Sequence, residues 1–81
     1  MKNVPNKKES KLPPELYQPT IKDVQILSGK TASTASRRLQ ELREALNRED
    51  HQAVFLTELC KYFAYPLRES CEQLGVPYNN N

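Results

Sequence analysis

Apolar residues recur at spacings of three and four along much of the chain, a period that predicts helices packed by one face. The first such stretch covers residues 21–28. Thr20 precedes it with a side chain suited to cap the first N–H groups, and Gly29 follows it with the freedom to adopt a left-handed conformation. We therefore expect a short helix that ends in a tight turn. Its expected inward stripe consists either of Ile21, Val24 and Leu27 or of Val24, Leu27 and Ser28.

A longer amphipathic stretch runs from about Thr31 to Leu46. Its apolar stripe recurs at spacings of four, three and four, which fits one face of an α-helix. Charges of both signs alternate between Glu41 and Arg48, as expected for a solvated surface above that stripe. The residues of the stripe are Ala35, Leu39, Leu42 and Leu46, flanked by Ala32 and Ala45.

The second half of the chain predicts two more helices. A polar connection at residues 47–52 leads to the apolar run at residues 53–56, which is either a brief strand or an extended segment that closes the core. Thr57 and Pro66 are residues suited to helix starts, and Gly75 is suited to a helix end. The expected elements are a helix from Glu58 to about Ala64, capped by Thr57, and a helix from Pro66 to Leu74.

One small domain accommodates all of these elements. We expect an all-α fold of about four helices over residues 13–75, with a single helical turn at residues 13–17 whose Leu16 and Tyr17 cover the core. Residues 1–12 are polar and rich in lysine, and residues 76–81 are short and polar. Both ends are predicted to be disordered, because neither has enough apolar surface to offset the entropy of ordering.

The charge distribution and the positions of the two cysteines indicate which kinds of partner and which compartment suit this chain. The 81 residues carry a net charge of +2, with the basic excess in the first half of the chain. One-sided basic charge suits contact with a polyanion. The chain has no apolar run near the ~20 residues that span a membrane, and no apolar region follows its early lysines as in a signal peptide. Cys60 and Cys71 fall at apolar-periodic positions, so we expect free, buried thiols in a cytoplasmic protein.

Catalytic and metal-binding signatures are missing from the sequence. His51 is the only histidine and lies in a polar stretch beside Asp50. Cys60 and Cys71 are eleven positions apart, without the paired spacing of a zinc site. Only two glycines are present, so no glycine-rich phosphate loop exists. We therefore expect a protein that is not an enzyme and has no cofactor or metal.

The segment TIKDVQILSGKTASTASRRL, residues 20–39, resembles the helix-turn-helix of lactose-repressor-type headpieces. Two positions depart from that pattern, because Lys30 and Arg38 stand where the family has apolar residues. The small size and the segment LTELCKYFAYP are also similar to excisionases, the DNA-binding accessory proteins of mobile elements. The positions that carry the first resemblance are Thr20, Val24, Gly29, Thr31, Thr34, Ala35, Ser36 and Arg37.

The resemblance implies sequence-specific binding of duplex DNA by residues 20–46, in transcription regulation or in recombination and excision. It places Ala32, Ser33 and Arg37 at base edges, where an arginine can reach guanine. It places contacts with the DNA backbone at Thr31, Thr34, Ser36 and Arg38, with Lys30 beside them. Lys2, Lys7, Lys8 and Lys11 would form an arm along the DNA.

Two alternatives remain open at this point. Arg37 and Arg38 would serve as ordinary surface charges if both paired with Glu41, which lies four and three residues further on. Separately, the alternative for the whole domain is a helical protein–protein interaction module that binds no nucleic acid. An exposed apolar groove would favour that alternative, and a basic face would favour DNA binding.

The helical pair at residues 55–74 repeats the pattern of residues 20–39, with a capped short helix, a tight turn and a second helix. Glu69 and Glu72 lie on its last helix, where phosphates would repel them. We therefore interpret this pair as a packing or protein-contact unit. It is a candidate surface for a homodimer or for a protein partner.

Overall fold

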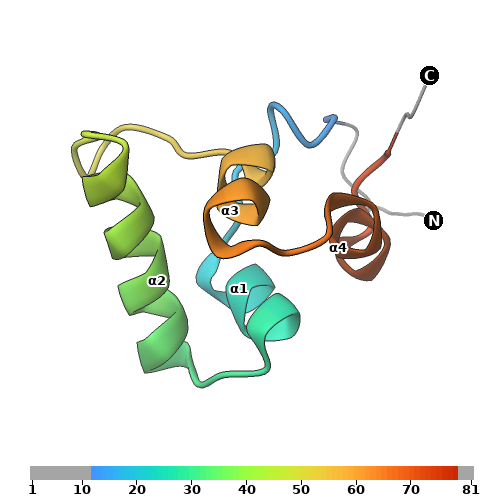
Figure 1. Ribbon diagram of the computed structural model, residues 1–81, viewed down its shortest axis with the longest axis horizontal. Helices are drawn as coiled ribbons and strands as arrows, with labels where there is room; N and C mark the ends of the chain where they lie inside the picture. Colours follow the sequence, from blue (N-terminus) through green and yellow to red (C-terminus); the bar gives the residue numbers. More distant parts are fainter. Residues whose placement is uncertain (1–11, 79–81) are drawn as a thin grey trace, which may run out of the picture.

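The computed structural model describes residues 12–78 and confirms a small all-α domain (Figure 1). The lysines expected to form an arm lie outside these residues. Helices α1 and α3 lie between α2 and α4, so that α1 contacts α2 and α4, and α3 contacts the same two helices. The four helices of the described part are α1 (Ile21–Ser28), α2 (Ala32–Ala45), α3 (Leu56–Phe63) and α4 (Leu67–Leu74).

Local chemistry explains the bounds of α1 and the start of α2, as expected. The Thr20 hydroxyl accepts from the Asp23 N–H at 3.1 Å, and the Asp23 carboxylate accepts from the Thr20 N–H at 3.0 Å. Gly29 then adopts a left-handed conformation with φ 71°, and its N–H donates to the Gln25 carbonyl. Thr31 caps α2 by accepting from the Thr34 N–H at 3.3 Å. The two helices are therefore joined by a turn of three residues.

Helix α3 begins at Leu56, two residues before the expected start, and Thr57 is not its cap. The Leu56 N–H donates to the Tyr17 carbonyl at 2.9 Å, and the Phe55 N–H donates to the Glu58 carboxylate at 3.0 Å. These two contacts satisfy N–H groups at the helix start that otherwise lack partners. The run before Leu56 is extended and forms no strand among the described residues.

The α3–α4 pair has the same backbone arrangement as α1–α2. In both pairs an eight-residue helix is followed by a left-handed residue, one more residue, and the N-cap of the next helix. Ala64, with φ 59°, occupies the place of Gly29. Pro66 is the N-cap of α4 and so lies just outside that helix, where it occupies the place of Thr31. The molecule therefore contains a second helix-turn-helix, 35 positions after the first.

The core is continuous across both pairs. Leu16, which was predicted to cover the core, is 52% exposed. Ile21 is 42% exposed, so the inward stripe of α1 is the one formed by Val24, Leu27 and Ser28. Val76 is buried although it follows the expected boundary at residue 75. The buried apolar side chains are Val24, Ala35, Leu39, Leu42, Val54, Leu56, Leu59, Cys60, Cys71 and Val76.

Tyr17 joins the N-terminal turn to both helix pairs. Its ring packs against the core, and its hydroxyl donates to the Asp23 carboxylate at 2.7 Å. Burial of the phenol, together with the bond and charge of Asp23, raises the pKa of Tyr17 to about 12. Its carbonyl accepts the Leu56 N–H of α3. One residue thus fixes the start of α1 relative to the start of α3.

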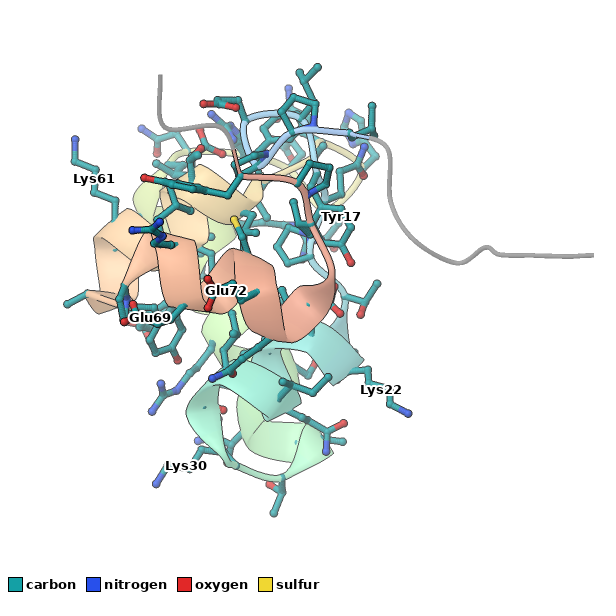
Figure 2. The ribbon with its side chains drawn as sticks, turned by 90° about the vertical axis from the view of Figure 1, so that its right-hand side faces the viewer. Tyr17, Lys22, Lys30, Lys61, Glu69 and Glu72 are labelled. Atoms are coloured by element: carbon teal, nitrogen blue, oxygen red, sulfur yellow. The ribbon has the colours of Figure 1, made fainter. Side chains whose placement is uncertain are left out.

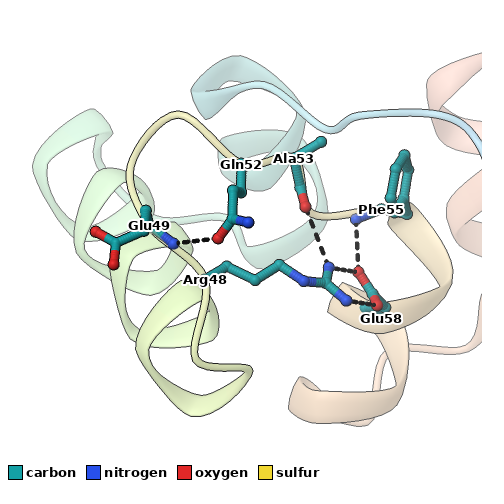
Figure 3. Close-up of polar contacts among 6 residues, drawn as sticks. All are labelled: Arg48, Glu49, Gln52, Ala53, Phe55 and Glu58. Atoms are coloured by element: carbon teal, nitrogen blue, oxygen red, sulfur yellow. Dashed lines mark hydrogen bonds and ion pairs between the residues drawn. The ribbon is translucent and has the colours of Figure 1, made fainter.

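Arg48 holds the polar connection to α3 (Figure 3). Its guanidinium donates two hydrogen bonds to the Glu58 carboxylate and a third, at 3.1 Å, to the Ala53 carbonyl. The hydrogen bonds from Arg48, aided by the Phe55 N–H and the Arg48 charge, hold the pKa of Glu58 below its ordinary value. The Arg48–Glu58 pair is the only ion pair within residues 12–78, and it links the polar connection to α3.

Candidate nucleic-acid interface

The N-terminal half of α2 and the turn before it form an exposed polar surface. Figure 2 shows Lys30 extending from this turn into solvent, and Lys22 extending from the neighbouring helix α1. Thr34 and Arg38 are only partly exposed. The remaining predicted contact residues are all exposed: Lys30, Thr31, Ala32, Ser33, Ser36 and Arg37. The fold therefore brings the predicted contact residues other than Arg38 together on the first half of α2 and the turn before it.

Thr31 caps α2, and Thr34 lies within its first turn. The Thr31 hydroxyl accepts the Thr34 N–H, and it lies 3.3 Å from the Thr34 hydroxyl. The N–H groups of Ala32 and Ser33 belong to the first turn, where a helix offers them no carbonyl partner. An anion at this end of α2 would meet those N–H groups and the positive end of the helix dipole.

Arg38 points away from the rest of this surface, toward the turn between α3 and α4. Its guanidinium donates to the Tyr65 hydroxyl at 2.7 Å and lies 5.3 Å from the centre of the Phe63 ring. Arg38, which stands where the headpiece pattern has an apolar residue, therefore covers aromatic rings of the α3–α4 helix pair. Leu39, next to it, is 4% exposed and takes the core position.

Neither Arg37 nor Arg38 forms the ion pair with Glu41 that the alternative interpretation requires. The Glu41 carboxylate accepts a hydrogen bond from the Tyr62 hydroxyl at 3.2 Å instead. Arg38 is bound to Tyr65, as described above, and Arg37 has no hydrogen-bond or ion-pair partner within residues 12–78. Arg37 is consequently an exposed, unpaired cation at the end of the molecule that carries Lys30.

The equivalent surface of α4 has a different charge. Glu69 and Glu72, at the positions equivalent to Thr34 and Arg37, are both exposed on α4 (Figure 2). Arg68 is the nearest cation on this helix, and its guanidinium lies 5.9 Å from the centre of the Tyr78 ring. Two carboxylates against one arginine make this surface poorly suited to phosphates.

Other features of the described residues offer less for ligand binding. An open hollow of about 540 Å³ is lined by Leu46, Glu58, Lys61 and Tyr62. No group of three acidic, cysteine or histidine residues in the described part is arranged to hold a metal ion. No helix within residues 12–78 is both long and apolar enough to cross a membrane.

The two cysteines are free and buried, as the apolar periodicity predicts. Burial raises the pKa of the Cys60 thiol. Burial also raises the pKa of Cys71, and nearby acidic groups add to the effect. Both thiols are therefore poor nucleophiles in the folded protein.

Sequence reasoning identified the exposed residues of α2 but missed the partners of Arg38 and Glu41. Those partners, Tyr65 and Tyr62, lie more than 20 positions away, so helix periodicity alone offers no signal for them. The comparisons with known proteins add no family assignment. Neither the protein-family models, nor the curated proteins, nor the solved structures include a match to this chain.

Proposed function

We propose that this protein binds duplex DNA through the α1–α2 helix-turn-helix. The observation that carries the proposal is Arg37, an exposed arginine without a partner, on a helix whose first turn follows a tight left-handed turn. At 14 residues α2 is about 21 Å long, so its N-terminal half alone fills a major groove ~12 Å wide.

The residues of this surface divide into two roles under the proposal. Arg37, Ser33 and Ala32 face base edges, where the guanidinium donates to guanine O6 and N7 and the alanine methyl meets a thymine methyl. Thr31, Thr34 and Ser36 bind phosphates together with the N–H groups of the first turn, the role that the headpiece resemblance implies for them. Lys30 adds positive charge beside them. Arg38 acts within the fold rather than on DNA, because its guanidinium is bound to Tyr65.

The cellular role that fits best is that of a small transcription regulator or of a recombination and excision accessory factor. The support is the similarity of residues 20–39 to repressor headpieces, and the small size shared with excisionases of mobile elements. Two free, buried thiols suit the reducing cytoplasm in which such proteins act.

The test starts with selection of a preferred site from a random duplex library, followed by fluorescence polarisation at two salt concentrations. Arg37→Ala is expected to weaken binding to the selected site by about 1–3 kcal/mol. Arg68→Ala is the matched control, since Arg68 is an exposed arginine on the equivalent helix α4. Equal affinities for Arg37→Ala and wild type, with both proteins folded, would refute the proposal. So would a wild-type protein that selects no duplex.

A further inference from the structure

Glu41 lies four residues after Arg37 on α2, at the spacing where helix side chains of opposite charge ordinarily pair. Both side chains are exposed, so neither is buried in a position that would prevent that contact. The pair is nevertheless absent, and the Glu41 carboxylate is bound to the Tyr62 hydroxyl of α3 at 3.2 Å. Tyr62 thus competes with Arg37 for the same carboxylate.

The position of the Tyr62 ring is fixed by its neighbours. It meets the Phe63 ring edge to face, with centroids 4.9 Å apart. Phe63 stacks on Tyr65 at 5.8 Å, and the Arg38 guanidinium covers Phe63. Aromatic pairs favour edge-to-face and offset-stacked geometries of this kind. Because Phe63 also packs against the core, the Tyr62 hydroxyl is held beside Glu41 by the fold.

We infer that Tyr62 is a positioning residue that holds Glu41 away from Arg37 and so keeps the Arg37 guanidinium open to DNA. This inference rests on the proposed function, because it assigns the availability of the base-reading arginine to a contact between α2 and α3. Without the hydroxyl, Glu41 swings along α2 to Arg37, and DNA must then break an ion pair before it binds.

The test uses Tyr62→Phe, which removes the hydroxyl and keeps the ring. On a selected duplex at low salt, Tyr62→Phe is expected to bind about twofold more weakly, the size of one exposed helix ion pair. In a Glu41→Gln background the same change should have no effect, because the competing carboxylate is gone. Tyr78→Phe is the matched control, since Tyr78 is 40% exposed and also lies at the rim of the domain.

A measurement without DNA separates this inference from the proposed function. In ¹⁵N spectra of the free protein, the Arg37 Nε–H signal should shift in Tyr62→Phe and return to its wild-type position in the double variant with Glu41→Gln. An unchanged Arg37 signal in Tyr62→Phe would overturn the inference, even if Arg37→Ala weakens DNA binding. So would an equal loss of affinity with and without Glu41. A shifted signal in a protein that binds no duplex would retain the contact but refute the DNA role of both residues.

Discussion

Leu39→Ala tests the helix phase on which the candidate DNA surface depends. Leu39 is 4% exposed in the core, whereas Arg37, two residues earlier, is fully outside it. The change removes three buried carbon groups, worth about 0.8 kcal/mol each in transfer free energy. A cavity term adds to this sum, and core leucine truncations cost about 2–5 kcal/mol in total. We expect about 3 kcal/mol, since Leu39 lies beside the partly exposed Arg38 and its site can relax.

Urea denaturation followed by circular dichroism at 222 nm measures this loss of unfolding free energy. A loss of 3 kcal/mol corresponds to a fall of more than about 12 °C in Tm for a domain this small. Gln40→Ala, at the exposed neighbouring position, is the matched control and should change stability by less than about 0.5 kcal/mol. If Leu39→Ala were as stable as Gln40→Ala, the phase of α2 would be wrong, and Arg37 would not face solvent.

Other perturbations test the turns, the ion pair, the thiols and the assembly. Gly29→Ala should lower the unfolding free energy by about 1 kcal/mol, as measured by urea denaturation. The cost is backbone strain alone, because Gly29 has a φ of 71° and the added methyl meets no atom within 4 Å. As pH falls below 4.5, the unfolding free energy should decline because the folded-state pKa of Glu58 is lowered, and this decline should be shallower in Glu58→Gln. Cys60 and Cys71 should react slowly with a thiol reagent until urea unfolds the chain, and fast native labelling would contradict their burial. Sedimentation should find a homodimer on DNA through residues 55–74, whereas one-to-one binding by a monomer would make that surface part of the core rim.

Local signals predicted α1 well and α3 less well, for a physical reason. Thr20 and Gly29 cap and end α1 by contacts within a few residues, so its bounds follow from the sequence. The start of α3 depends on the Tyr17 carbonyl, which lies 39 positions before Leu56 and gives no local sign of its role. Local signals therefore predict capping by Thr57, whereas the helix begins at Leu56, whose N–H donates to the distant Tyr17 carbonyl.

The candidate surface followed the same division between local and distant contacts. The exposed face of α2 could be read from periodicity, because buried and exposed positions alternate regularly around one helix. The different contacts of Arg37 and Arg38 could not be predicted from periodicity. They depend on which aromatic side chains of α3 and the turn after it lie beside α2. Leu16 was expected to cover the core and is exposed, because the short turn around it directs Tyr17 inward instead.

The two helix-turn-helix units allow one chain to serve as its own comparison. Where both units have the same type of residue, the backbone arrangement requires that type. Val24 and Leu59, for example, are both fully buried at the same place in the first helix of each unit. Where they disagree, as at Arg37 and its acidic counterpart Glu72, the arrangement leaves the choice free. Transplanting the exposed residues of α2 onto α4 would therefore exchange surface chemistry with little change in scaffold. If α2 binds duplex DNA as proposed, a molecule with two such surfaces would be a starting point for engineering a bridge between two duplexes.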